Sequence, residues 1–131
     1  MARTSTVLYR NSIKLKGCRF GGYLLIPDSV KSIGAHCFSG SSADIFFRSS
    51  SQLEALGDYA YSNYRGTSVF IPQAVKSISE KAFHNCHEIY AMVYGGSRES
   101  WKEISYSAID TDLEYAEFIF DADLNEYIFG Y

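Results

Sequence analysis

Apolar positions along this chain recur in blocks of about 22 residues. Each block opens with a short apolar run, continues with a Val or Leu and then an Ile or Leu three positions later, and closes before a polar turn. Residues 26–34 return almost unchanged as residues 71–79, and a diverged copy lies at residues 47–57. The blocks end at aromatic residues that are 23 and then 22 positions apart, namely Phe38, Tyr61 and Phe83. A period in this range is typical of solenoids built from stacked supersecondary units.

One block is too short to bury its own apolar side chains, whereas stacked blocks bury them against their neighbours. Equivalent positions then form three rows in the core: a Val/Leu row, an Ile/Leu row and an aromatic row. The predicted core residues are Val30, Ile33, Phe38, Leu53, Leu56, Tyr61, Val75, Ile78 and Phe83. Gly34 and Gly57 follow the second row, where we expect a tight turn with a positive φ.

The repeat resembles the BspA-like (Treponema pallidum-type) leucine-rich repeat over residues 22–121. The resemblance rests on equivalent positions of three copies: Ile26-Pro27, Val30, Ile33-Gly34 and Phe38; Leu53, Leu56-Gly57 and Ala60-Tyr61; and Ile71-Pro72, Val75, Ile78, Ala82-Phe83 and Cys86. Residues 94–104 are similar to the segment that closes such arrays, with Trp101 packed over the last coil. The resemblance implies an α/β solenoid: a short right-handed array of four to five coils, with a parallel β-sheet on the concave face and short helical or irregular segments opposite.

The length of 131 residues fits a single domain. We assign residues 1–21 to an N-terminal cap or degenerate coil, residues 22–94 to the repeats and residues 95–131 to a closing coil. No apolar run is long enough to cross a membrane, and the first residues lack the apolar core of a signal peptide. We therefore expect a cytoplasmic protein, or a secreted or surface protein if the chain is a fragment of a larger one.

Charges are distributed unevenly along the chain. Residues 1–31 contain six Lys or Arg and one acid, whereas residues 103–131 contain eight acids and no Lys or Arg. Because order along a solenoid is also order in space, we expect a basic end and an acidic end. The predicted acidic surface is Asp110, Asp112, Glu114, Glu117, Asp121 and Asp123.

The chain carries little that indicates catalysis or metal binding. The His36-Cys37 pair and the segment 84–87 contain zinc-ligand residue types, but their spacing does not fit short zinc patterns. We read the three cysteines as reduced and mostly buried, and we expect no metal. The alternating C-terminal acids lack the central Gly and closing Glu of an EF-hand. Neither a nucleophile elbow nor a phosphate-binding loop is present, so we predict no enzyme and no cofactor.

Alternation along the predicted strands separates two faces of the sheet. If the outer two residues of each apolar triplet enter the core, the middle ones line the concave face, and these are Leu25, Phe46, Phe70, Val93 and Ile119. We expect them to form a contiguous exposed patch, which usually marks an interaction site, with Tyr23, Arg48 and Tyr90 as a polar and aromatic rim. The alternatives are that the N-terminal residues or the tail fold over this row, or that a homodimer hides it.

These features favour a non-catalytic protein-binding module that contacts another protein, or a second copy of itself, through an apolar concave face. The modest basic charge and the missing recognition motif argue against direct binding of nucleic acid. One alternative is a small acidic inhibitor, of phage or mobile-element type, that occupies a basic nucleic-acid-binding surface of a host protein. Another is a structural end-module of a bacterial surface adhesin.

Overall fold

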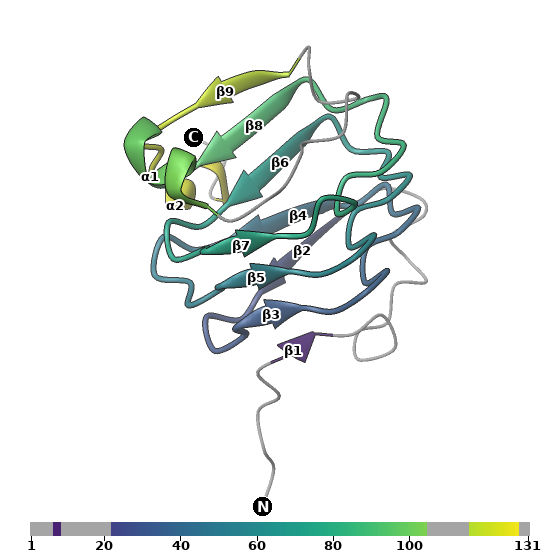
Figure 1. Ribbon diagram of the computed structural model, residues 1–131, viewed down its shortest axis with the longest axis horizontal. Helices are drawn as coiled ribbons and strands as arrows, with labels where there is room; N and C mark the ends of the chain where they lie inside the picture. Colours follow the sequence, from purple (N-terminus) through teal and green to yellow (C-terminus); the bar gives the residue numbers. More distant parts are fainter. Residues whose placement is uncertain (1–6, 9–21, 105–115, 129–131) are drawn as a thin grey trace, which may run out of the picture.

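The computed structural model describes residues 7–8, 22–104 and 116–128, which form a solenoid of stacked coils (Figure 1). Successive coils begin with four-residue strands: β2 (Tyr23–Ile26), β4 (Asp44–Phe47), β6 (Ser68–Ile71) and β8 (Ala91–Tyr94). Two-residue strands lie on the other side: β1 (Val7–Leu8), β3 (Ser32–Ile33), β5 (Ala55–Leu56) and β7 (Ser77–Ile78). The closing part contains α1 (Arg98–Glu103), β9 (Glu117–Ile119) and α2 (Leu124–Ile128).

All strand pairs among the described residues are parallel, as the repeat requires. The short strands form one sheet in the order β1-β3-β5-β7, and the long strands form the pair β2-β4 and the sheet β6-β8-β9. Repeat-equivalent residues are paired, for example Leu25 with Phe46 and Phe70 with Val93. The parallel solenoid expected from the sequence is therefore confirmed.

Two details of the expected architecture are different. The side opposite the long strands is built in the described coils from two-residue strands and turns, and both described helices belong to the closing part. The long-strand side is also divided, because β4 and β6 pack together without joining one hydrogen-bonded sheet. The rings of Phe46 and Phe70 bridge this division with centroids 5.1 Å apart.

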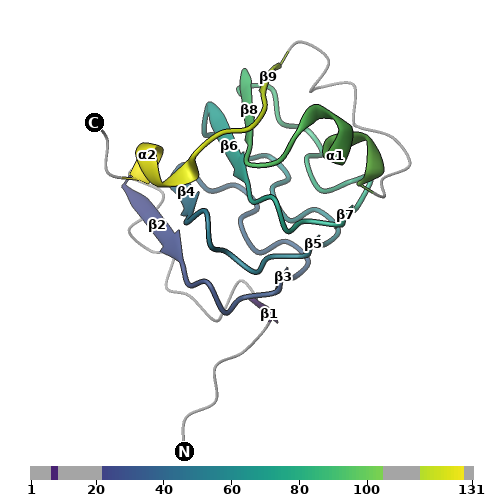
Figure 2. The same cartoon turned by 90° about the vertical axis from the view of Figure 1, so that its left-hand side faces the viewer.

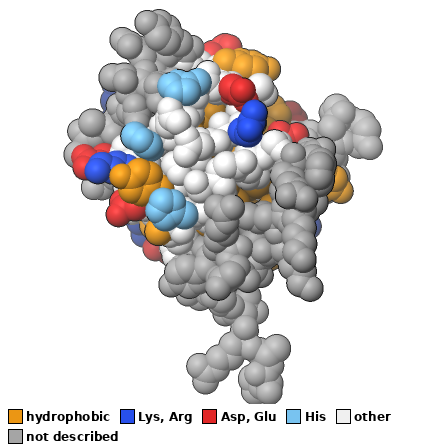
Figure 3. All heavy atoms as spheres, turned by 90° about the vertical axis from the view of Figure 1, so that its right-hand side faces the viewer, with side chains coloured by type: hydrophobic (Ala, Val, Ile, Leu, Met, Phe, Trp, Pro, Cys, Tyr) orange, Lys and Arg blue, Asp and Glu red, His pale blue; other side chains and the backbone are white. Residues whose placement is uncertain are grey.

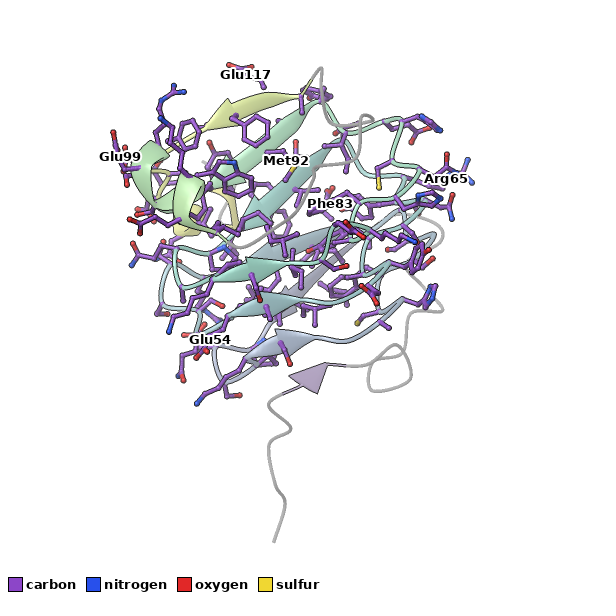
Figure 4. The ribbon with its side chains drawn as sticks, in the orientation of Figure 1. Glu54, Arg65, Phe83, Met92, Glu99 and Glu117 are labelled. Carbon is purple, nitrogen blue, oxygen red and sulfur yellow. The ribbon has the colours of Figure 1, made fainter. Side chains whose placement is uncertain are left out.

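The predicted core is confirmed at every position. All nine residues of the three rows are buried, with no more than 6 % of any of them exposed. In the aromatic row the ring of Tyr61 lies 5.2 Å from Phe38 and 5.3 Å from Phe83. Figure 4 shows Phe83 and Met92 pointing into the space between the strands, whereas Glu54, Arg65 and Glu117 point outwards. Each coil thus buries its apolar side chains against the next coil.

Two buried tyrosines differ in how their hydroxyl groups are satisfied. Tyr64 donates a hydrogen bond of 2.7 Å to the carbonyl oxygen of Ala43. The hydroxyl of Tyr61 is also buried, but no described group forms a hydrogen bond with it. Burial raises the pKa of both phenols above its usual range, because it disfavours the phenolate.

Close approach between coils, and not a positive φ, requires glycine at Gly57. Neither Gly34 nor Gly57 has a positive φ, so that expectation is wrong. The amide of Gly57 instead donates to the carbonyl oxygen of Ile33, and a Cβ at Gly57 would lie only 2.9 Å from that oxygen. Positive φ values occur a few residues later, at repeat-equivalent turn positions: 74° at Gly40, 55° at Asn63 and 60° at Asn85.

Trp101 closes the stack, as predicted. It lies in α1, whose first turn is capped by Ser97 through a hydrogen bond from the Ser100 amide. Only 7 % of Trp101 is exposed. Its ring makes edge contacts with Tyr94 at 5.1 Å and with Phe118 at 5.4 Å. The indole therefore packs between Tyr94 of β8 and Phe118 of β9, the strand that pairs with β8, and covers the core at this end of the described coils.

Candidate protein-binding surface

The long strands separate the core from a second face as alternation predicts. Residues on either side of the predicted row are buried in the core, including Ile26, Ile45, Phe47, Val69, Ile71, Met92 and Tyr94. The middle residues of the same strands therefore point away from the core, and the register aligns them in rows.

The middle of this row is not exposed, which corrects the expectation of an open patch. Phe70 is only 6 % exposed and Val93 only 2 % exposed. Figure 2 shows α2 beside the long-strand side, next to β2 and β4. The ring of Tyr127 in α2 lies 5.2 Å from that of Phe70. The alternative that the tail folds over the row is therefore correct at Phe70.

Local hydrogen bonds explain why the chain forms α2 at this place. Asp123 accepts a hydrogen bond of 3.1 Å from the amide of Asn125, an N-cap interaction. The same carboxylate accepts a bond of 2.9 Å from the Ser49 hydroxyl, and the Ser49 amide donates to Oδ1 of Asn125 at 3.0 Å. Leu124, between these two residues, is 1 % exposed. We call these contacts with Ser49 the α2 clamp.

Two residues of the row, Phe46 and Phe70, form an aromatic ladder with Tyr23 and Tyr127. Successive ring centroids lie 6.0, 5.1 and 5.2 Å apart. Tyr23 is 70 % exposed and Tyr127 is 38 % exposed, while Phe46 and the adjacent Leu25 are half-buried. The open part of the surface thus lies at Tyr23 on β2 and at its half-buried neighbour Phe46 on β4, a strand that α2 also contacts.

The predicted rim is not brought together as one feature. Tyr23 begins β2 and Tyr90 immediately precedes β8, so both lie at the amino-terminal ends of parallel strands. Arg48 follows β4 and lies at the opposite end. Tyr90 is 62 % exposed and Arg48 is exposed, whereas Ile119 in β9 is half-buried.

The acidic surface is described only in part. Asp110, Asp112 and Glu114 lie outside the described residues, while Glu117, Asp121 and Asp123 are exposed on β9 and on the approach to α2. With Glu126 they give the described segment 116–128 four acids and no Lys or Arg. Asp123 has a structural role in addition, because it caps α2 and binds Ser49.

The Cys and His residues considered as metal ligands point in different directions. Cys37 and Cys86 are fully buried, as predicted, and the Cys86 thiol donates to the carbonyl oxygen of Tyr61. His36 and His84 are exposed on the turn side, where Figure 3 shows the histidines gathered. Within the described ranges no three His, Cys, Asp or Glu side chains lie together as a metal site would require. Cys18 lies outside them.

The turn side carries a cluster that the sequence analysis missed. The ring of His36 stacks on Tyr59 at 5.0 Å, the ring of His84 meets Tyr59 edge-on at 5.6 Å, and the Lys81 ammonium lies 5.8 Å from the same ring. His36, Tyr59 and Lys81 occupy equivalent positions, 23 and 22 residues apart. Comparing exposed as well as apolar positions between repeats would have found this cluster.

Several hollows border the closing part of the described structure, including the following two. One, of about 290 Å³, is beside the α2 clamp and is lined by Ser49, Gln73, Gly95 and residues 121–124. The other, of about 380 Å³, is lined by Arg98, Trp101, Phe118 and Phe120. The Arg98 guanidinium lies 4.7 Å from the centre of the Phe120 ring, an arrangement that a cation–π attraction favours.

Comparison with known proteins agrees with the repeat geometry. None of the helices among the described residues has the length and apolar character needed to cross a membrane. Searches of curated proteins and of solved structures returned no match. A family model described as "BspA type Leucine rich repeat region (6 copies)" matches residues 13–131. Together with the parallel coils and their stacked core rows, this match shows that the chain belongs to the BspA-type leucine-rich repeat family.

Proposed function

We propose that this chain is a non-catalytic protein-binding module that contacts its partner through the open part of the aromatic ladder on β2 and β4. The observation that carries this proposal is the exposed ring of Tyr23, held edge-on against the half-buried Phe46 beside Leu25. Contiguous apolar surface of this kind usually marks an interaction site. Tyrosine is also among the residues that most often dominate binding energy at protein interfaces.

The chemistry and rigidity of the surface support binding over catalysis. Tyr23 and Phe46 lie on paired parallel strands, so their backbone positions are fixed before a partner arrives. Aromatic side chains have only two rotatable angles, so they lose little entropy when they become ordered in an interface. Acid–base catalysis needs positioned titratable groups, whereas this part of the face is mainly apolar. Leucine-rich repeats of this family are typically non-catalytic.

Affinity capture with paired variants tests the proposal. The test variant is Tyr23→Ser/Phe46→Ser, and the matched control is Glu54→Ser/Lys76→Ser, whose exposed residues flank the short strands β5 and β7. A protein captured by the wild type and the control is purified, and its affinity for the wild type and for each variant is measured by calorimetry. Loss of one dominant interface residue costs about 2 kcal/mol, so the test variant should bind at least about 30-fold more weakly.

The melting temperatures of both variants must be measured first, so that unfolding is not mistaken for lost binding. Equal affinity of the wild type and the Tyr23→Ser/Phe46→Ser variant for the purified partner would contradict the proposal. Weaker binding by the control variant alone would move the interface to the short-strand side.

The acidic segment supports a second candidate, the inhibitor that occupies a basic surface. Four exposed acids between residues 116 and 128, with no Lys or Arg among them, would attract such a surface and accelerate association. Salt separates the two candidates, because the Debye length falls from about 10 Å at 0.1 M to about 3 Å at 1 M. Binding that weakens steeply with salt favours the acidic contact, and binding that persists favours the apolar one.

A further inference from the structure

We infer that the long-strand face accepts a short amphipathic helix, and that α2 is the chain's own occupant of part of this site, displaced when a partner helix of the same pattern docks. This inference rests on the proposed function, since it specifies the chemistry of the partner at the same surface. Docking of an amphipathic helix into an apolar groove is a recurrent mode of protein recognition.

The first step is the pattern by which α2 is held. Asp123 caps the helix and binds the Ser49 hydroxyl, Leu124 is buried, and Tyr127 places its ring on Phe70. Leu124 and Tyr127 are three positions apart, so they lie on the same side of the helix. The face thus receives from α2 an acidic cap, a leucine and then an aromatic residue one turn later.

The second step is the match between helix and ladder. Side chains three or four positions apart on a helix are about 5–6 Å apart, and neighbouring parallel strands are separated by about 4.8 Å. The ladder rings at Tyr23, Phe46 and Phe70 are 6.0 and 5.1 Å apart. A helix that crosses β6, β4 and β2 can therefore place one apolar side chain per turn on each ring. Tyr127 of α2 uses the ring of Phe70, and α2 packs against β4, where Phe46 stays half-buried. Part of Phe46 and most of Tyr23 are therefore left for a longer helix.

The third step concerns how easily α2 leaves. A helix of five residues is too short to be stable without its packing contacts. The clamp bonds to Ser49 are exposed or only partly buried, and Tyr127 remains 38 % exposed. A hollow of about 290 Å³ lies beside the clamp, at the amino-terminal end of α2. Elements with few buried contacts open at a smaller cost than the core does.

Occupancy by α2 has a measurable consequence. If a competing helix binds only when α2 has left, its apparent affinity falls in proportion to the fraction of molecules in which the face is open. Weakening α2 must then strengthen binding of the competitor, which is the opposite of the effect expected if α2 were simply part of the binding surface.

The test uses a fluorescently labelled synthetic peptide of three helical turns that repeats the α2 pattern of leucine and tyrosine. Anisotropy measures its binding to the full chain and to the full-length variant Leu124→Ser/Tyr127→Ser, in which α2 is unseated. We expect the variant to bind about tenfold more tightly or better, and a peptide with serine in place of its leucines and tyrosines not to bind. Adding Phe46→Ser to the variant should weaken binding by about tenfold or more.

Ser49→Ala serves as a second variant if Leu124→Ser/Tyr127→Ser does not fold, because it removes only one hydrogen bond of the clamp. We expect its affinity for the peptide to lie between those of the wild type and the double variant. Equal binding by the wild type and the weakened variants overturns the inference, as does binding that ignores Phe46→Ser. If a purified partner binds through Tyr23 and Phe46 but the peptide does not bind, the proposed function stands and only the helix inference falls. If the peptide binds but no partner depends on these residues, the helix inference stands and the proposed function falls.

Discussion

Replacing Tyr61 by phenylalanine should stabilise the protein, although it removes a polar atom and adds none. Tyr61 is 1 % exposed, and within the described part of the chain its hydroxyl has no hydrogen-bond partner. The equivalent positions of the neighbouring coils are occupied by Phe38 and Phe83, whose rings contact that of Tyr61. The repeat therefore already shows that a phenyl ring fits this row.

The expected magnitude follows from the cost of the unpaired hydroxyl. A buried polar group without a hydrogen bond costs about 1–3 kcal/mol. Phenylalanine removes this cost, but the small void left by the missing oxygen offsets part of the gain in stability. We expect Tyr61→Phe to raise the free energy of unfolding by about 1 kcal/mol.

Tyr64→Phe is the matched control, because the same atom is removed from a neighbouring buried tyrosine. Its hydroxyl donates a hydrogen bond of 2.7 Å to the carbonyl oxygen of Ala43, a residue with no exposed surface. The change leaves this oxygen without its partner, so we expect a loss of about 2 kcal/mol. Identical chemical changes three positions apart should therefore have opposite signs.

Urea denaturation, followed by fluorescence and by circular dichroism, measures both effects. With a slope of about 1.5 kcal/mol per M, the difference of about 3 kcal/mol separates the midpoints of the two variants by about 2 M urea. If Tyr61→Phe destabilises the protein as much as Tyr64→Phe does, the Tyr61 hydroxyl has a partner and the reasoning is refuted. If neither variant differs from the wild type, the aromatic row is not packed as described.

Four further predictions concern the stack. Trp101→Ala should lower the free energy of unfolding by about 3–5 kcal/mol, because the core at this end of the described coils loses its cover; an unchanged melting temperature would contradict this role. Ile78→Ala should cost about 2–5 kcal/mol by cavity formation in the Ile/Leu row, and a loss below about 1 kcal/mol would refute the repeat register. Gly57→Ala should cost about 1–3 kcal/mol, because its Cβ would meet the Ile33 carbonyl oxygen at 2.9 Å; a calorimetric melt checks this, and a neutral result would show that the coils separate freely. Stability should also fall as the pH rises above about 10. Burial raises the pKa of Tyr61 and of Tyr64, so the unfolded chain releases protons that the folded chain retains. A free energy of unfolding that stays constant between pH 10 and 11 would exclude this linkage.

The repeat made the core predictable. Residues such as Val30, Leu53 and Val75 recur at one position of each copy, and stacking is the arrangement that buries all of them. The family resemblance supplied the parallel strands. It also led to the expectation of short helical or irregular segments opposite the sheet, where the described coils have two-residue strands and turns. Two-residue strands such as β5 carry too short a pattern to be read from sequence, since their pairing depends on neighbours a full coil away.

The candidate surface was predictable only in part. Strand alternation identified the residues of the row, but it carries no information on what packs over them. The cover at Phe70 comes from Tyr127, which is 57 positions away in sequence. The clue was local: an Asp followed by Leu and, three positions later, Tyr, which is the pattern of a short capped amphipathic helix. The turn at Gly57 was misread for a similar reason, because its constraint comes from Ile33 in the preceding coil.

Hydrogen exchange of the complex with a purified partner tests the central claim most directly. We predict slower exchange of amides in β2 and β4 when the partner is bound, because binding at Tyr23, Leu25 and Phe46 restricts local opening of these strands. Exchange in β3, β5 and β7, on the other side of the coils, should stay unchanged. Protection confined to the short strands or to the turn side around Tyr59, with β2 and β4 unaffected, would contradict the account.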